Sequence, residues 1–513
     1  MQLQKLLSAL VLIGVVTGAA AQTEPSTNAL VTNALAKPPG WTERLLSMDQ
    51  CIQLALSNNL DIKFQSYSPL VSLYTLNAAY TTYDPSLSFT ARKSHTESPA
   101  SINNSNPFFN QPSTVSESES YSLGLAGGLP SGLTYDLTGP LTKNRYSSNA
   151  PTWSSSGFGF ATIDQPLLKN FWIDNTRATI QIDKANLKIS RQAVRLQIIT
   201  TITAVKTAYY NLILARGSVE ADARALQLAQ QLADQNKMKV QIGTLAQLDE
   251  KQAESQAAAS QATLLAAQHN LATQENTLKA LLTGNYAEWA TVAPVPSEQL
   301  VAVPETLDRQ DSWRQALTQR PELIEDKLKV EQQKVTIKYD KNQLYPQIDL
   351  TGSYGHNANS TSLTTTANDI ADGRYLSWSY GVSVSYPLGN VAPRNAYKIS
   401  KTSLEQLLVQ LKQEEQAIMV QVDNDIGQVQ STYEQVKATR EARLYAEEAL
   451  AAERTKLENG KSTSFNVLQL ISNLTAARVS EIQALANYNI ARAQLEQDEG
   501  TTIEANNLDF KVR

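Results

Sequence analysis

The feature that most constrains the fold is an internal repeat. The segment that begins at Ser47 reappears in altered form from Asp308 onward, and further matches follow at constant spacing. Two matched pairs are 261 residues apart (316 − 55), Ala55 with Ala316 and Pro85 with Pro346, and two are 217 apart (460 − 243), Arg177 with Arg394 and Gly243 with Gly460. Because constant offsets over long stretches indicate duplication, we expect two structural repeats, at 47–284 and 307–500.

Each predicted repeat carries the same elements in the same order. A helix of about 35 residues leads to Pro85 or Pro346, strand-like sequence follows, and a long helical hairpin ends the repeat. The long helices are predicted at 173–242 and 394–459, the returning helices at 247–283 and 464–499, and the glycines that end them are Gly243, Gly284, Gly460 and Gly500. Glycine is common at helix C-termini, and each long helix would span roughly 100 Å at 1.5 Å per residue.

The composition of these helices favours narrow contacts between neighbours. They are rich in Ala, Gln, Leu and Glu, with Ala/Leu seams at coiled-coil spacing, as in 254–268. Such seams let helices pack closely while their other faces remain wet. The helices alone therefore fit a rod-like coiled coil and a barrel of helices equally well.

The stretch 376–386 alternates without a slip between large apolar residues and Ser or Gly. Its apolar members are Leu376, Trp378, Tyr380, Val382, Val384 and Tyr386. A membrane-spanning β-strand needs about 9–11 residues, apolar toward lipid and polar inward. A half-buried strand of a soluble sandwich has the same period. The small polar residues on the second face favour the membrane interpretation.

Similar alternation in other segments extends the predicted sheet. We expect apolar residues to face lipid at Ile348, Leu350 and Tyr354, at Tyr121, Leu123 and Leu125, and at Phe158 and Phe160. Residues 94–120 and 357–374 are rich in Asn, Ser and Thr and are expected to be external loops. The turn at 127–132 predicts an additional hairpin over 121–138.

The N-terminus predicts export from the cytoplasm. Lys5, an apolar run over 6–16 and the small residues before Gln22 form the pattern of a signal peptide. We therefore assign 1–21 to a signal peptide, 22–46 to a linker, 285–306 to a proline-broken insert and 501–513 to a C-terminal tail. No later apolar run predicts a membrane-spanning helix.

The sequence predicts no reaction. Cys51 is the one cysteine, and the three histidines are scattered. No pattern for a metal, phosphate or nucleophile site occurs, so we expect no enzyme activity, no catalytic residue, no bound metal and no cofactor. The net charge of −5 disfavours nucleic acid as a partner.

One chain has too few strands to close a barrel in a membrane. An open sheet cannot lie in lipid, because its edge N–H and C=O groups would lack partners. Cyclic assembly of several copies removes those edges. We therefore expect an oligomer.

These residues together resemble the TolC-type outer-membrane factor family. The resemblance covers about 47–500 and lies in the opening 48–60, the strand end 165–168 and the hairpin motifs 243–249 and 460–468. It implies an α+β membrane protein built from an internal duplication, a homotrimer whose outer-membrane β-barrel continues into a long periplasmic α-helical barrel. The additional hairpin departs from the four strands per subunit that the resemblance implies.

The resemblance also implies a function and its sites. The chain would form the exit duct of a tripartite efflux pump or type I secretion system, a passive conduit coupled to a periplasmic adaptor and an inner-membrane transporter. The insert and tail would form a belt. Adaptor docking would fall on Gly243, Thr244, Leu245, Gly460, Lys461 and Ser462, and a periplasmic gate on Asp249, Asn466 and Gln469.

Two alternatives share some of these features. A periplasmic adaptor also has a signal peptide and helical hairpins, but its β-domains are soluble. A secreted structural coiled coil would lack the lipid-patterned strands altogether.

Overall fold

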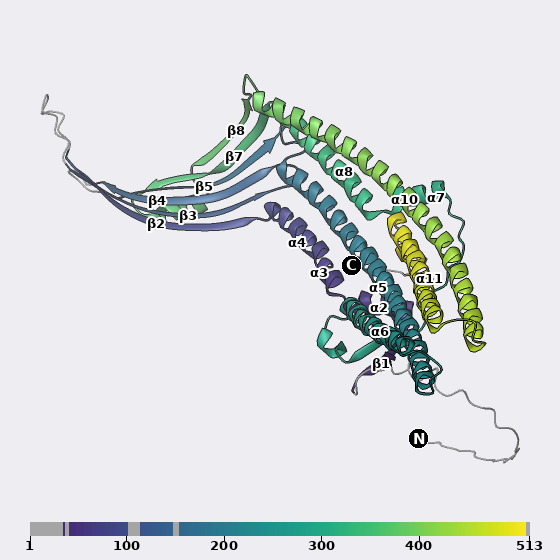
Figure 1. The fold of residues 1–513 in the computed structure, drawn as a ribbon. Helices are drawn as coiled ribbons and strands as arrows, with labels where there is room; N and C mark the ends of the chain where they lie inside the picture. Colours follow the sequence, from purple (N-terminus) through teal and green to yellow (C-terminus); the bar gives the residue numbers. More distant parts are fainter. Residues whose placement is uncertain (1–33, 36–39, 101–112, 147–152, 509–513) are drawn as a thin grey trace, which may run out of the picture.

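The computed structural model describes residues 34–35, 40–100, 113–146 and 153–508. A long β-sheet forms one end of the molecule, and a layer of helices continues it toward the other end (Figure 1). The predicted signal peptide lies outside the described residues, as do parts of the predicted linker and tail.

The sheet has six antiparallel strands in the order β2-β3-β4-β5-β7-β8. The strands are β2 Ser86–Ser98, β3 Thr114–Gly128, β4 Thr134–Tyr146, β5 Trp153–Pro166, β7 Gln347–Ser360 and β8 Leu376–Ser385. The additional hairpin is present as β3 and β4, and it is longer than its sequence pattern indicated. Each strand has the length that a membrane span requires.

The two segments expected to be external loops are more ordered than predicted. Most described residues of 94–120 belong to β2 and β3. In 357–374 the strand β7 continues to Ser360, and the helix α9, Leu363–Ala371, follows. Ser and Thr have side chains that suit a wet strand face as well as a loop, so composition alone misassigned these residues.

The helices before the sheet are broken, where the sequence predicted single helices of about 35 residues. In the first repeat α2 Met48–Asn58, α3 Leu60–Gln65 and α4 Ser68–Tyr80 follow one another, and in the second α7 Arg309–Gln319 and α8 Pro321–Asn342 do. Asn59 and Arg320 both adopt extended backbone, with ψ of 128° and 121°. The Asn59 side chain caps α3, and Pro321 opens α8, so both breaks have local causes.

Two long hairpins form the body of the helical part. They are α5 Asn175–Gln241 with α6 Gln247–Leu282, and α10 Val391–Glu458 with α11 Ser464–Glu499. Their boundaries agree with the predicted ones to within three residues. Helix α4 packs on α5, α5 on α8 and α8 on α10, while α6 and α11 pack on α5 (Figure 1).

The core lies between these helices. Val205, Tyr209 and Leu212 of α5 are fully buried against α2 and α6. The Tyr209 hydroxyl donates to the Leu46 carbonyl at 3.0 Å, which ties α5 to β1, Thr42–Leu46. Strand β1 lies in the expected linker and pairs in parallel with β6, Val292–Pro296, of the insert. Backbone hydrogen bonds thus hold the insert to the N-terminal segment.

Within the described residues α5 is also long and apolar enough to cross a membrane. Most of its apolar stretch is buried inside the protein, 61% in all. Packing against neighbouring helices therefore accounts for that stretch. The remaining short elements are η1 Thr81–Tyr83, η3 Tyr286–Trp289 and α12 Thr502–Ala505.

Candidate functional site

The strand register gives the sheet one apolar face. Directly paired residues in antiparallel strands point to the same side. One row of such residues crosses all six strands and consists of Leu87, Leu125, Leu137, Ala161, Tyr354 and Trp378. Trp378 and Tyr380 are 62% and 79% exposed, and their rings stack in parallel with centroids 5.8 Å apart. Such exposure of large apolar groups marks a surface that water does not cover in the assembled protein.

The opposite face is largely polar and carries mostly small side chains. One of its rows consists of Ser86, Ala126, Asp136, Thr162, Ser353 and Ser379. The hydroxyl oxygens of Ser353 and Ser379 lie 2.7 Å apart. A sheet with one apolar and one polar face separates an apolar medium from a wet one.

Phe158 and Phe160 lie on the polar face, so their predicted orientation is wrong. Phe160 pairs with Gly355, which pairs with Ser377. The glycines that alternate with them, Gly157 and Gly159, take the apolar face, where a β-carbon would come within 3.1–3.2 Å of Ile370 in α9. Alternation reveals the period of a strand, whereas only the pairing reveals which set faces which side.

The remaining residues of 376–386 that were predicted to face lipid lie on the apolar face of the sheet or directly after it. Leu376, Trp378, Tyr380, Val382 and Val384 lie on β8, and they pair across to β7. Tyr386 lies just beyond the end of β8, where its hydroxyl is 3.4 Å from the Asn390 side-chain nitrogen.

Both edges of the six-stranded sheet are open in the described structure. Strand β2 pairs with β3 alone and β8 with β7 alone. The helical layer below has similar edges, because α3 and α4 expose Phe64, Val71 and Tyr74 and α10 exposes Val409 and Val420. Exposed apolar side chains at both edges of one layer are surfaces that fit contact with another chain.

The two hairpin turns have the same backbone conformation. Gly243 and Gly460 have φ of +76° and +68°, and a β-carbon at either would meet nothing within 4 Å. The following N–H groups, of Thr244 and Lys461, donate to the carbonyls of Lys239 and Lys456 at 2.9 and 2.8 Å. This is a Schellman C-cap, so glycine serves the turn itself. Leu245 and Ser462 are half-buried, and the other four docking candidates are exposed.

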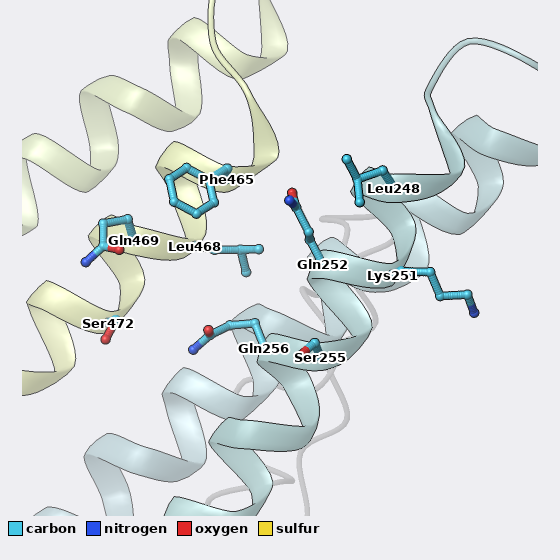
Figure 2. Close-up of a pocket in the computed structure, with 9 residues that line it drawn as sticks. All are labelled: Leu248, Lys251, Gln252, Ser255, Gln256, Phe465, Leu468, Gln469 and Ser472. Atoms are coloured by element: carbon cyan, nitrogen blue, oxygen red, sulfur yellow. The ribbon is translucent and has the colours of Figure 1, made fainter.

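Exposed apolar side chains surround these turns, although the sequence motifs of the turns did not include them. They are Met238, Ile242, Leu248 and Phe465. Leu248 of α6 and Phe465 of α11 face each other across a groove of about 380 Å³ (Figure 2). Gln252 and Gln469 also line this groove. Their sequence signal is that all four are large apolar residues close to a turn and outside the Ala/Leu seams.

The predicted gate residues lie close to the tip on both returning helices. Asp249 is half-exposed in the first turn of α6, a position that the helix dipole favours for a carboxylate. Asn466 donates to the Ser462 hydroxyl at 3.5 Å, and Gln469 donates to the Asn473 side chain at 3.2 Å. Among the described residues, no hydrogen bond joins the Asp249 carboxylate to either amide within one subunit.

A buried amide connects the two hairpins at this level. Asn236 of α5 is fully buried, accepts a hydrogen bond from the Ser464 hydroxyl at 3.0 Å and donates to the Asp249 carbonyl at 3.2 Å. Buried polar groups need partners, and here the partners come from α6 and α11. The sequence signal was an Asn within an otherwise apolar seam, a pattern that fixes register in helical assemblies.

A comparison with known protein families identifies the family of this chain. Residues 51–284 and 313–501 match a protein family described as "outer membrane efflux protein". This chain belongs to the outer membrane efflux protein family. The match includes both long hairpins and all six strands of the large sheet.

Solved structures show that this efflux protein has the fold of outer-membrane channels. It is similar to the outer-membrane channel OprN, with 14% identity, a TM-score of 0.65 and coverage of 88% of this chain and 90% of that chain. It is also similar to the Campylobacter jejuni CmeC outer membrane channel, with 16% identity, a TM-score of 0.65 and coverage of 91% and 90%. A third similar structure is the open state of the Neisseria gonorrhoeae MtrE outer membrane channel. Its identity to this chain is 16% and its TM-score is 0.62, with coverage of 89% of this chain and 89% of that chain. No curated protein sequence matches the chain.

Membership places this efflux protein in the outer membrane, with a helical periplasmic part. The resemblance to TolC-type channels is thereby confirmed. The alternatives of a periplasmic adaptor and a secreted coiled coil are set aside, because the matched family consists of outer-membrane channels.

Proposed function

We propose that three copies of this chain close into one continuous duct, which serves as the passive exit of a tripartite efflux pump or type I secretion system. The observation that carries this proposal is the pair of open edges, β2 with α3 and α4 on one side and β8 with α10 on the other. Different surfaces at the two edges make a head-to-tail contact, and such a contact forms a ring when the rotation between successive copies closes.

The two faces of the sheet then take defined environments. The face that carries Trp378 turns to lipid, and the face that carries Ser379 lines the duct. Apolar residues on β8 extend from Leu376 to Val384, about 26 Å along the strand at roughly 3.3 Å per residue. At a strand tilt of about 40° they cover about 20 Å of the roughly 25 Å apolar band of an outer-membrane barrel.

The tips supply the contact with the other pump components. The exposed turns that include Thr244 and Lys461, together with Ile242 and Phe465, form an amphipathic end surface. A periplasmic adaptor that offers complementary apolar and polar groups would dock there and connect the duct to an inner-membrane transporter. The groove between Leu248 and Phe465 gives that contact a defined register.

Two further features belong to the proposal. The repeats 47–284 and 307–500 arose by duplication, and the equivalent helix breaks at Asn59 and Arg320, 261 residues apart (320 − 59), support this. Symmetric assembly would bring Asp249, Asn466 and Gln469 of each copy toward the axis, where they would form a gate.

The test is the mass of the purified protein in mild detergent. We expect three copies per particle, outer-membrane fractionation and a mobility that changes on heating, because the closed barrel resists unfolding. A particle that contains one copy would contradict both the trimer and the duct, since the edges of a single sheet cannot remain unpaired in a membrane.

A further inference from the structure

The additional hairpin is continuous with the rest of the sheet. Strand β3 pairs with β2 over its length, β4 pairs with β3, and β5 pairs with β4. Leu125 and Leu137 occupy the apolar row that also contains Trp378. The hairpin is therefore paired like the other four strands, and its apolar side chains point to the same side as theirs. It neither folds over the sheet nor projects from it.

The polar face of the hairpin is lined by small groups. On β3 it carries Ser118, Ser120, Ser122 and Gly124, and on β4 it carries Thr138 and Thr142. The short helix that packs on the described part of the sheet, α9, lies on the other face, through Ile370 against Gly157 and Gly159. Both strands can thus line an open lumen.

The width of the sheet agrees with this placement. Six strands spaced about 4.8 Å apart and tilted by about 40° span about 38 Å around a barrel wall. The four helices of the layer that the sheet continues, α4, α5, α8 and α10, span about 36 Å at roughly 9 Å per helix. Four strands would span only about 25 Å.

We propose that the outer-membrane part of the duct is an eighteen-stranded barrel, six strands from each of three copies, whose open lumen admits bulky solutes along its whole length. This inference rests on the proposed trimeric duct. Barrel diameter grows roughly in proportion to strand number, so this lumen is about 1.5-fold wider than that of a twelve-stranded barrel. Barrels of 16–18 strands leave an aqueous channel, and size selection then falls on the helical part and its tip.

The first test removes the hairpin. Deletion of 114–146 leaves β2 and β5 antiparallel and joined through 99–113 and 147–152, with four strands per copy. Polymers of graded size are added on the external side of channels in a planar bilayer. We expect the largest polymer that enters to be about one third smaller in radius for the deletion variant. Equal limits for the two channels would overturn the inference while leaving the duct intact.

The second test does not depend on the deletion variant assembling. Ser122→Cys places a thiol on the proposed lumenal face, and Leu123→Cys is the matched control on the lipid face. Burial raises the pKa of the native Cys51 thiol to about 12, so Cys51 remains unreactive. A charged thiol reagent from the external side should change the conductance of the Ser122→Cys channel and leave that of Leu123→Cys unchanged.

The outcomes separate the two proposals. If trimeric channels form and neither cysteine variant responds, the hairpin lies outside the lumen and the wide barrel is wrong, whereas the duct stands. If the full chain forms no trimeric channel, the proposed function fails first and the wide barrel fails with it. Images of the trimer in lipid nanodiscs that show twelve strands would also contradict the inference.

Discussion

The two long hairpins have nearly the same length and very different surroundings. Helix α5 has 28 buried residues among its 67, whereas α10 has nine among 68. The first packs on α4, α6, α8 and α11, and the second packs on α7, α8 and α11 while its opposite face is exposed. The contrast teaches that the subunit is complete around α5 and incomplete at α10, so the two helices should respond differently to substitution.

The largest effect is expected at the free face of α10. Val409 and Val420 are both 60% exposed and lie opposite the buried stripe that contains Val422 and Val429. The double variant Val409→Asp/Val420→Asp should abolish trimer formation, because two charges would be buried at the subunit contact. Mass in detergent measures assembly, and circular dichroism should show the helices retained.

Lys412→Asp is the matched control on the same helix. Its side chain is exposed and pairs with Glu415 at 3.2 Å at the surface, an interaction worth little. Trimers that persist in the double variant would show that α10 faces solvent and would remove the contrast with α5.

The next effect concerns the two faces of β8. Trp378→Asp and Tyr380→Asp should impair membrane assembly, because a charge on the lipid face costs up to a few kcal/mol depending on depth. Ser379→Asp, between them, should be tolerated in the wet lumen. The heat-modifiable fraction in outer membranes measures the effect, and equal damage at all three positions would mean that β8 does not face lipid.

A smaller effect, on the pH dependence of stability, is expected when Asp425, one of the few buried residues of α10, is replaced. Burial, together with the adjacent Asp498 carboxylate, raises the pKa of Asp425 to about 7, although Gln421 and Arg320 oppose the shift. The folded state thus binds a proton that the unfolded state releases near pH 4. Stability from this group is present below about pH 4 and is lost as pH rises toward 7.

Asp425→Asn should therefore flatten the fall in unfolding free energy between pH 4 and pH 8, by an amount on the order of 1 kcal/mol or more. Urea unfolding across this range measures it. Glu405→Gln, an exposed change on the same helix, should leave the slope as it is. A wild-type slope in the Asp425→Asn protein would show that Asp425 does not hold its proton in the folded state.

The smallest expected effect is a change in ion selectivity when residues at the two hairpin tips are exchanged. Asp249 begins the returning helix of the first hairpin, and Asn466 occupies the corresponding turn of the second. Asp249→Asn should lower the cation preference of single channels, and Asn466→Asp should raise it and strengthen block by divalent cations from the periplasmic side. Unchanged conductance, selectivity and block in both variants would leave Asp249 as a carboxylate stabilised by the dipole of α6, with no role in a gate.

Much of the fold could be predicted because its signals are local. The glycines at 243 and 460 end their helices in the left-handed conformation that side chains resist, so the hairpin boundaries follow from the chain itself. The period of β8 is equally local. The helix breaks at Asn59 and Arg320 were also encoded locally, in a capping Asn and in the proline at 321, but the apolar pattern across them concealed the breaks.

Other features depended on contacts between distant segments. Phe158 and Phe160 alternate with glycine in a way that fits either face, and only the pairing of β5 with β7 and the position of Ile370 assigned them to the polar side. The buried role of Asn236 likewise requires Ser464, which is 228 residues away in the chain.

The repeating order of elements, the lengths of the hairpins and the period of the strands follow from the amino-acid sequence alone, because backbone conformation and side-chain alternation are set by neighbouring residues. The contacts of the folded chain decided which strand face carries the apolar rows, that six strands join one sheet, and that α5 buries far more residues than α10. Those properties arise from which surfaces meet, and helices of similar length and composition can be buried or exposed according to their neighbours.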